Sequence, residues 1–210
     1  MARPSQAKEN LIKAATDLIW EHSYGATSVD DICARAEVRK GSFYHFFESK
    51  AHLTIATIDA AWAVKLPVLN ETFSPLTPPL ERFRRHATHL LECQEQRLAA
   101  TGHVCGCPLA TLASEVGTQD ELIRAKVAEI FNLHLCFYES AIRDAARAGL
   151  IDGHESAFKA ETVQACIQGA CSQARVLNNL NPVRHLERAI LTILGADRAA
   201  AVEPAPLIPA

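Results

Sequence analysis

Apolar side chains recur every three or four residues along most of the chain, the spacing that gathers them on one face of an α-helix. Leu11, Ala15 and Leu18 begin this pattern, and polar residues fill the positions between them. The spacing predicts an amphipathic helix over about residues 5–22, which Ser23-Tyr24-Gly25 ends. No strand-like alternation appears anywhere, so we expect an all-α fold.

A short second helix is predicted near residues 28–35. Thr27 followed by Asp30 resembles a capping box, in which a hydroxyl accepts a hydrogen bond from an unpaired backbone N–H of the first turn. The tight connection Ala36-Glu37-Val38 then separates this helix from the next one. Short helix, tight turn and short helix together indicate a helix-turn-helix, whose second helix enters the major groove of DNA.

The third predicted helix, over residues 40–47, has two chemically different faces. Phe43, Phe46 and Phe47 share one face, which suits a hydrophobic core. The opposite face suits DNA, because lysine binds phosphate, glycine admits a close backbone approach, and Tyr and His side chains reach phosphates or base edges. That face carries Lys40, Gly41, Tyr44 and His45, and surface residues of an ordinary helical bundle are the alternative.

A fourth helix is predicted from Ser49 to Pro67, where proline should disrupt further helical hydrogen bonding. The proline-rich segment 67–79 is the best candidate for a domain boundary. Helical patterns follow over about 80–99, 107–116 and 118–148. Two further apolar stripes, at 163–177 and 183–194, predict helices that pack as a pair, and a loose tail follows them.

The N-terminal motifs resemble the DNA-binding signature of the TetR family of transcriptional regulators. The matching residues form one ungapped stretch: Ala26-Thr27-Ser28-Val29-Asp30-Asp31-Ile32, Val38, Lys40 to Phe47, Ser49-Lys50 and Leu53. The resemblance implies an all-α homodimeric repressor that binds a palindromic operator and is released by a small-molecule effector. It implies a helix-turn-helix domain at 1–52, a connecting helix at 53–67, a ligand-binding and dimerisation domain at 68–197 and a flexible tail at 198–210.

Carried over by position, the resemblance assigns phosphate contacts to the start of the bracing helix and a recognition surface to the helix that follows it. Thr27 and Ser28 would touch phosphate at the start of the bracing helix, and Arg39 is added for its charge. Three residues depart from the family pattern: Glu37 and Ser23 replace usual glycines, and Arg39 replaces a capping Ser or Thr. The full expected recognition surface is Arg39, Lys40, Gly41, Ser42, Tyr44, His45 and Lys50.

Composition adds limits on location and partners. The net charge is −3, and the first 52 residues are neutral overall, so DNA binding must come from a local basic face. No apolar stretch approaches the roughly 20 residues of a membrane span, and the chain lacks a signal-peptide core. Seven cysteines, an odd number, favour reduced thiols over a disulfide framework. We therefore expect a cytoplasmic protein with no membrane partner.

The sensor half needs a cavity between helices, since an effector must bias one of two states. Aromatic residues at helical spacing are more often plain core, and we favour core packing over ligand contact for them. His134 is likewise read first as a core histidine and second as a polar ligand contact. The candidate ligand-binding residues are Trp62, Phe83, Cys107, Phe131, His134, Phe137 and Tyr138.

Cys107 begins a predicted helix after Gly106, and this Gly-Cys start resembles a TetR subgroup that includes sensors of reactive electrophiles. The positive end of a helix dipole favours the thiolate, hence nucleophilicity. Structural packing is the first interpretation, electrophile or redox sensing with Cys105 as partner the second, and a metal site with His103 and Cys93 the third. A Cys-dependent enzyme lacks an orienting group, so we expect no catalytic residue, metal or cofactor.

Overall fold

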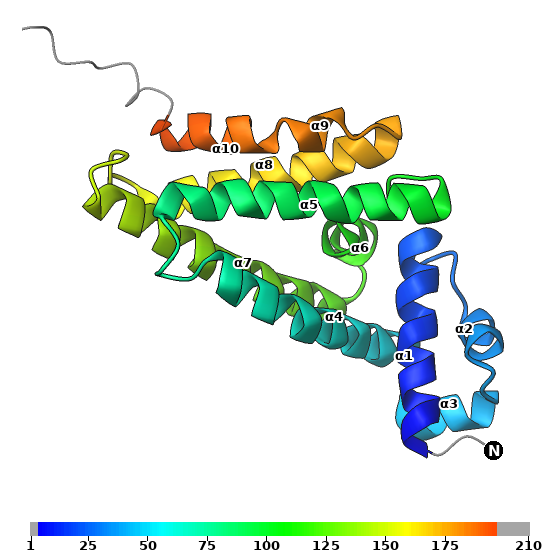
Figure 1. Ribbon diagram of the computed structural model, residues 1–210. Coiled ribbons are helices and arrows are strands. Elements are labelled where there is room, and N and C mark those ends of the chain that lie inside the picture. Colours follow the sequence, from blue (N-terminus) through cyan, green and yellow to red (C-terminus); the bar gives the residue numbers. More distant parts are fainter. Residues whose placement is uncertain (1–3, 197–210) are drawn as a thin grey trace, which may run out of the picture. The chain divides into compact units, whose positions relative to one another are not determined.

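The computed structural model describes residues 4–196, with side chains from Gln6 onward, and every element in this part of the chain is a helix. The all-α expectation is confirmed, whereas the predicted tail at 198–210 lies outside the described residues. Figure 1 labels the helices in chain order. They are α1 (Pro4–Glu21), α2 (Val29–Ala36), α3 (Lys40–Phe46), α4 (Lys50–Thr72), α5 (Pro79–Thr101), α6 (Pro108–Val116), α7 (Glu121–Arg147), α8 (Ser156–Leu177), α9 (Asn181–Arg184) and α10 (Leu186–Leu194).

The chain forms two compact units. The first contains the described residues up to Val68 together with Cys105–Leu133, and the second contains Leu69–Val104 and the described residues from His134 onward. The α6 segment and the first half of α7 therefore fold with the N-terminal helices rather than with α5. The domain division given by family resemblance stays a prediction.

Helices α1, α2 and α3 pack around one apolar cluster in the first unit (Figure 1). Leu11, Ile32, Phe43 and Leu53 are completely buried in it. Each side chain comes from a different helix, α1 to α4, so the cluster fixes all four elements together. Burial of such side chains stabilises a fold by about 1.5–3 kcal/mol each relative to exposure.

A second apolar cluster in the same unit joins α4, α6 and the first half of α7. Ile58 of α4, Leu112 of α6 and Ile130 of α7 are buried there. Ile19 of α1 packs against this cluster and against the first one. The helices that bear the DNA-binding signature thus share a continuous core with α6.

Helix α4 corrects one prediction, because it does not end at Pro67 but continues to Thr72. Proline costs the helix one hydrogen bond and a steric contact with the preceding turn. Pro67 is exposed, and the apolar residues Leu69 and Phe73 just beyond it are buried at 2% and 6% exposure. Burial of these side chains offsets the local loss, so the helix continues.

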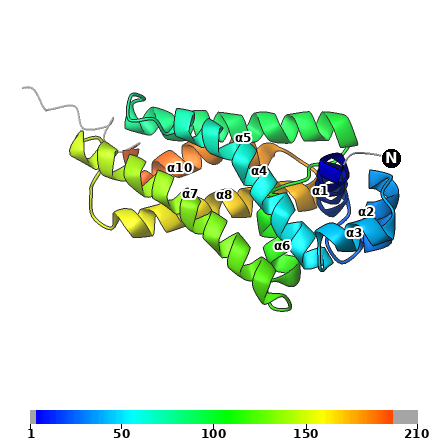
Figure 2. The ribbon, with the colours of Figure 1, turned by 90° about the horizontal axis from the view of Figure 1, so that it is seen from below.

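In the second unit, α8 and α10 pack together as the two stripes predicted, with α5 and the short α9 against them (Figures 1 and 2). Val163, Ile167, Cys171 and Ala174 of the α8 stripe are buried within the single chain. Most of the stripe therefore packs inside the protomer, whereas Leu177 at its end is exposed. No helix in residues 4–196 is long and apolar enough to cross a membrane.

Candidate nucleic-acid interface and adjoining pocket

Helix α2 begins with a capping box one residue later than the sequence predicted. Ser28 is the N-cap: its hydroxyl accepts from Asp31 N at 3.1 Å, and its backbone N–H donates to Asp31 Oδ2 at 2.8 Å. The Ser28 hydroxyl also donates to Asp31 Oδ2 at 2.6 Å, and this bond, with the one from the Ser28 backbone N–H, holds the pKa of the Asp31 carboxyl below its usual value. The predicted capping box of Thr27 and Asp30 is wrong, because Thr27 is buried and its hydroxyl donates to Ser23 O at 2.8 Å.

The turn between α2 and α3 uses the left-handed conformation that usually requires glycine. Glu37 has φ 55° and ψ 37°, and its backbone N–H closes α2 by donating to the carbonyls of Ala34 and Cys33. Ser23, which also replaces a usual glycine, has φ 143°. A side chain in such a conformation costs on the order of 1 kcal/mol. Burial of the apolar cluster between α1, α2 and α3 offsets this cost.

Helix α3 has the two faces that the sequence predicted. Phe43 and Phe47 are buried, at 0% and 6% exposure, whereas 55% of Tyr44 is exposed. Lys40, Gly41 and His45 are exposed as well, Ser42 is half-buried, and Arg39 is an exposed N-cap without a side-chain hydrogen bond. A short helix that is fastened by phenylalanines on one side therefore presents polar groups to solvent on the other.

Two lysines of the expected recognition surface have partners within the protein. Lys40 Nζ lies 2.8 Å from Asp30 Oδ1, and this partner raises the lysine pKa. Lys50 is half-buried, and its Nζ donates to the carbonyls of Tyr24 at 2.9 Å and Thr27 at 3.0 Å. Burial lowers the pKa of Lys50, with Glu115 opposing the shift. Both DNA contacts remain predictions.

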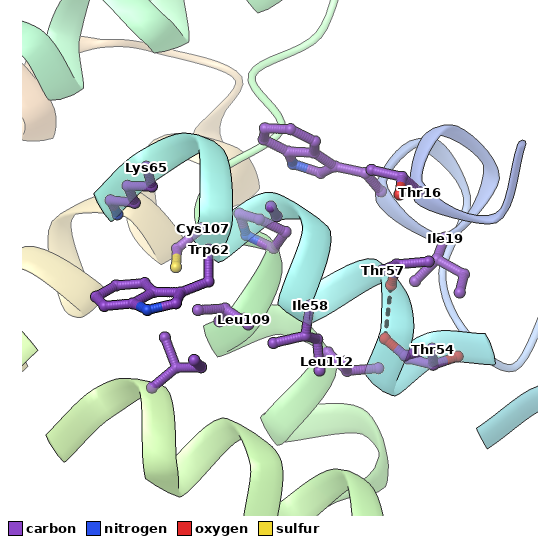
Figure 3. Close-up of a pocket in the computed structure, with 14 residues that line it drawn as sticks. Thr16, Ile19, Thr54, Thr57, Ile58, Trp62, Lys65, Cys107, Leu109 and Leu112 are labelled. Atoms are coloured by element: carbon purple, nitrogen blue, oxygen red, sulfur yellow. Dashed lines mark hydrogen bonds between the residues drawn. The ribbon is translucent and has the colours of Figure 1, made fainter. Parts of the chain in front are cut away.

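A cavity of about 140 Å³ lies inside the first unit, between α1, α4, α6 and α7. Trp62 extends across it, with the sulfur of Cys107 beside the indole and Lys65 one turn further along α4 (Figure 3). Leu109 and Leu112 of α6 form much of the apolar wall. Sequence reasoning named Trp62 and Cys107 as candidate ligand-binding residues but missed Lys65. Only its helical spacing from Trp62 could have suggested Lys65.

The other candidate ligand-binding residues are not in this cavity. Phe131 packs beside the α4–α6–α7 cluster in the first unit. Phe83, His134, Phe137 and Tyr138 lie in the second unit, in an aromatic cluster around Phe73. The buried His86 joins this cluster through a 2.9 Å hydrogen bond between its Nε2 and the Tyr138 hydroxyl. Sequence reasoning missed Phe73 and His86, which helical spacing on α4 and α5 could have suggested.

Cys107 is the half-buried N-cap of α6, whereas Cys105 is buried and does not line the cavity. Within residues 4–196, no group of three or more His, Cys, Asp or Glu side chains could hold a metal ion. The metal set of His103, Cys105, Cys107 and Cys93 is therefore not assembled in this part of the chain.

Helix α2, the tight turn after it, and a helix α3 with one buried and one exposed polar face form a helix-turn-helix. This arrangement is typical of DNA-binding proteins. Residues 11–57 match the family described as bacterial regulatory proteins, tetR family. Residues 79–189 match the C-terminal domain of LmrA/YxaF-like transcriptional regulators. The chain belongs to the TetR family of DNA-binding transcriptional regulators.

Named relatives and solved structures agree with this assignment. The chain is 27% identical to the transcriptional regulator AcuR of Cereibacter sphaeroides, over 88% of this chain and 83% of AcuR. It is 24% identical to the transcriptional repressor DhaR of Mycobacterium sp. strain GP1, over 87% and 89%. A regulatory protein TetR from Rhodobacter sphaeroides, 27% identical, superposes with a TM-score of 0.77 over 88% of this chain and 96% of that one.

Reduced Escherichia coli NemR has the same fold, with a TM-score of 0.78 at 22% identity over 90% of this chain and 96% of NemR. The families and relatives matched are regulators of transcription, and none of them indicates a catalytic activity.

Proposed function

We propose that this protein is a repressor that leaves its operator when a small molecule occupies the cavity beside α6. The observation that carries the proposal is the division of α3, where Phe43 and Phe47 are buried and Tyr44, His45 and Lys40 face solvent. The relative DhaR is itself named a repressor. We further propose that the protein works in the cytoplasm, where a chromosomal operator would lie.

The exposed face of α3 fits the major groove of DNA. Tyr44 and His45 are long enough to reach base edges or phosphates, and Lys40 can bind a phosphate as a point charge. Asp30, in the first turn of α2, holds Lys40 in the absence of DNA. Because both residues are more than half exposed, phosphate can displace the carboxylate at little cost.

The cavity volume fits a small effector. At about 140 Å³ it resembles the cavities that hold one benzene ring, and it is smaller than the 300–1,000 Å³ typical of drug-sized ligands. Its walls include Thr16 and Ile19 of α1, the first helix of the DNA-binding part. An effector here would contact the helices that position α3.

Within this proposal, Cys107 is the group that senses an electrophile. Its sulfur faces the cavity at the N-cap of α6. The thiolate would add to the β-carbon of a quinone or an unsaturated aldehyde. The carbon–carbon π pair moves to the carbonyl, and the enolate takes a proton from water, so no oxidant is needed. Cys107 as a plain packing residue is the alternative outcome.

Operator binding and release test the proposal separately. DNA from upstream of the gene itself, followed by fluorescence anisotropy at fixed salt, should bind the wild type but not the Lys40→Ala, Tyr44→Ala double variant. Glu48→Gln, an exposed change just beyond α3, is the matched control. Unchanged binding by the double variant would remove α3 as the recognition surface.

Release is tested with p-benzoquinone, a single-ring electrophile. It should weaken operator binding by the wild type but not by Cys107→Ser. Cys136→Ser, which removes the exposed thiol of a different cysteine, is the control and should respond as the wild type does. Release that persists in Cys107→Ser would show that the cysteine only packs.

A second copy of the chain is the expected partner, because dimers are typical of this family. Helix α8 exposes Phe158, Val176 and Leu177, at 62%, 82% and 65%. Between them, Ala165, Gly169 and Ser172 are exposed small residues at helical spacing, which allow a close approach of two helices. We propose this exposed face of α8 as the dimer contact.

A further inference from the structure

The turn between α1 and α2 is held by side chains from two distant helices of the same unit. The peptide group that joins Tyr24 to Gly25 is bound on both sides. Its N–H, on Gly25, donates to Glu115 Oε1 at 2.5 Å, and its carbonyl, on Tyr24, accepts from Lys50 Nζ at 2.9 Å. The N–H of Tyr24 also donates, to Glu115 Oε2 at 2.9 Å.

The carboxylate lies close to the backbone of the turn. A Cβ added to Gly25 would lie 2.8 Å from Glu115 Oε1, so any other residue at this position would require the carboxylate to move away. Lys50 Nζ lies 3.9 Å from the centre of the Tyr24 ring and also holds the carbonyl of Thr27, directly before the N-cap Ser28. Together Glu115 and Lys50 form a clamp that fixes the turn and the start of α2.

Glu115 connects this clamp to the cavity through a single rigid element. Helix α6 begins after Cys107, its residues Leu109 and Leu112 line the cavity, and Glu115 follows Leu112 by one turn. Eight residues separate Cys107 from Glu115, about 12 Å along a helix axis. A short straight helix of this length moves as one body, so a shift at its cavity end displaces the carboxylate at its other end.

We propose that Glu115 is the positioning residue that transmits the state of the cavity to the α1–α2 turn. A group larger than the cavity pushes α6 outward, Glu115 withdraws from the two N–H groups, and the turn that orients α2 and α3 loosens. The inference rests on the proposed function for its biological meaning, since operator release is the event that the loosened turn would cause.

The electrostatics of the clamp agree with this role. Burial, with Asp120 and Glu115 nearby, raises the pKa of the Tyr24 phenol, while Glu115 offsets part of the effect of burial on the Lys50 pKa. Withdrawal of Glu115 would leave a half-buried ammonium with less compensation and two backbone donors without an acceptor. Both changes favour a rearranged turn over the clamped one.

Hydrogen exchange at the Tyr24 and Gly25 amides, followed by NMR, tests the inference on the full-length protein. N-phenylmaleimide, which is larger than the cavity can hold, serves as the probe at Cys107. Labelling should speed exchange of both amides in the wild type by about tenfold, the factor that a charge-assisted hydrogen bond supports. Cys107→Ser treated in the same way controls for labelling of the other cysteines, and its exchange at the two amides should not change.

Glu115→Gln should show the faster exchange before labelling and no further increase after it. Ser114→Ala, an exposed change on the same helix, should behave as the wild type. A purely structural role for Glu115 would leave the response to labelling intact in Glu115→Gln, and this result would overturn the inference.

Operator binding by the same labelled samples separates this inference from the proposed function. Release of DNA without faster exchange at the two amides supports the proposed function and overturns the transmission by Glu115. Faster exchange with operator binding unchanged supports the transmission and contradicts release from this cavity. Unchanged exchange and unchanged binding in a fully labelled protein overturn both.

Discussion

At Gly41, fold stability and the proposed DNA binding should make opposite demands. Gly41 lies exposed in α3, and an added Cβ would meet no atom of the protein within 4 Å. Alanine there should stabilise the fold by about 0.5–1 kcal/mol, because it reduces the freedom of the unfolded chain. If the backbone approaches DNA at this point, the methyl group should weaken operator binding by about tenfold.

Two measurements on Gly41→Ala check this prediction: urea denaturation for stability and anisotropy for affinity. A loss of affinity in a protein that has become more stable cannot arise from unfolding, so the first measurement is the control for the second. Unchanged affinity would place Gly41 outside the interface.

Asp31 makes the stability of α2 dependent on pH. Hydrogen bonds from Ser28 hold the Asp31 pKa below its usual value, so the folded state prefers the carboxylate. This contribution is complete above the unfolded pKa of about 4 and is lost as the pH falls through the lower folded pKa. Asp31→Ala should therefore lower the melting temperature at pH 5–7, and its difference from the wild type should shrink toward pH 3.

Thermal unfolding followed by circular dichroism measures that difference. Glu9→Ala removes an exposed carboxylate from α1 and controls for net charge. A difference between Asp31→Ala and the wild type that stays constant with pH would show that the carboxylate does not stabilise the cap.

At this scale, sequence reasoning succeeded where a side chain's role depends on its own helix. The period of α3 was enough to separate Phe43 from Tyr44, because residues one apart point in different directions. Ser28 caps α2 and Thr27 does not, but the sequence pattern alone cannot distinguish two adjacent residues that both carry a hydroxyl. Glu115 could not be found, since its partners Tyr24 and Gly25 lie 91 and 90 residues away in the chain.

At the scale of elements, the connection between α4 and α5 is held by a buried ion pair that local pattern does not reveal. Arg82 is 3% exposed, and its Nη1 donates to Asp144 Oδ2 of α7 at 2.6 Å. Its Nε also donates to the carbonyl of Thr77 at 2.8 Å, in the segment that links the two helices. One side chain thus fixes this segment to α7.

Arg82→Ala should destabilise the protein by about 3 kcal/mol, because it leaves the Thr77 carbonyl without its donor and the Asp144 carboxylate with the exposed Arg147, at 2.7 Å, as its ion-pair partner. The matched control is Arg85→Ala on the same helix, whose ion pair with Glu81 is exposed and should be worth less than about 1 kcal/mol. Chemical denaturation gives both values. Equal small losses in the two variants would mean that the buried pair does not hold the segment.

Element boundaries show why the predicted helices were mostly placed well and α4 was not. Turn residues near α2, α5 and α6 act locally, so the sequence places these helices, although the α2 cap is Ser28 rather than Thr27. The continuation of α4 past Pro67 depends on the burial of Leu69 and Phe73, which is a property of the assembled second unit. The grouping of α6 with the N-terminal helices is likewise tertiary and has no local signal.

At the scale of the whole molecule, the proposed repressor would need two copies of α3, because one copy could contact only half of a palindromic operator. Linking two half-site contacts in a dimer raises affinity far beyond that of either one alone. A dimer that forms through the exposed face of α8 would bury Val176, which is 82% exposed in the single chain. A charge at this position should separate the copies without disturbing the fold of each.

Val176→Glu should therefore elute as a monomer of 22.9 kDa in size-exclusion chromatography with light scattering, where the wild type elutes at twice this mass. Its operator affinity should fall at least about a hundredfold, because the second half-site contact is lost, while its helical circular dichroism stays unchanged. Leu76→Glu places the same charge at a residue that is 95% exposed, in the connection between α4 and α5, and should remain dimeric. A dimeric Val176→Glu that still binds the operator would move the interface to another surface, and the spacing of the two α3 helices would then have to be set by that surface.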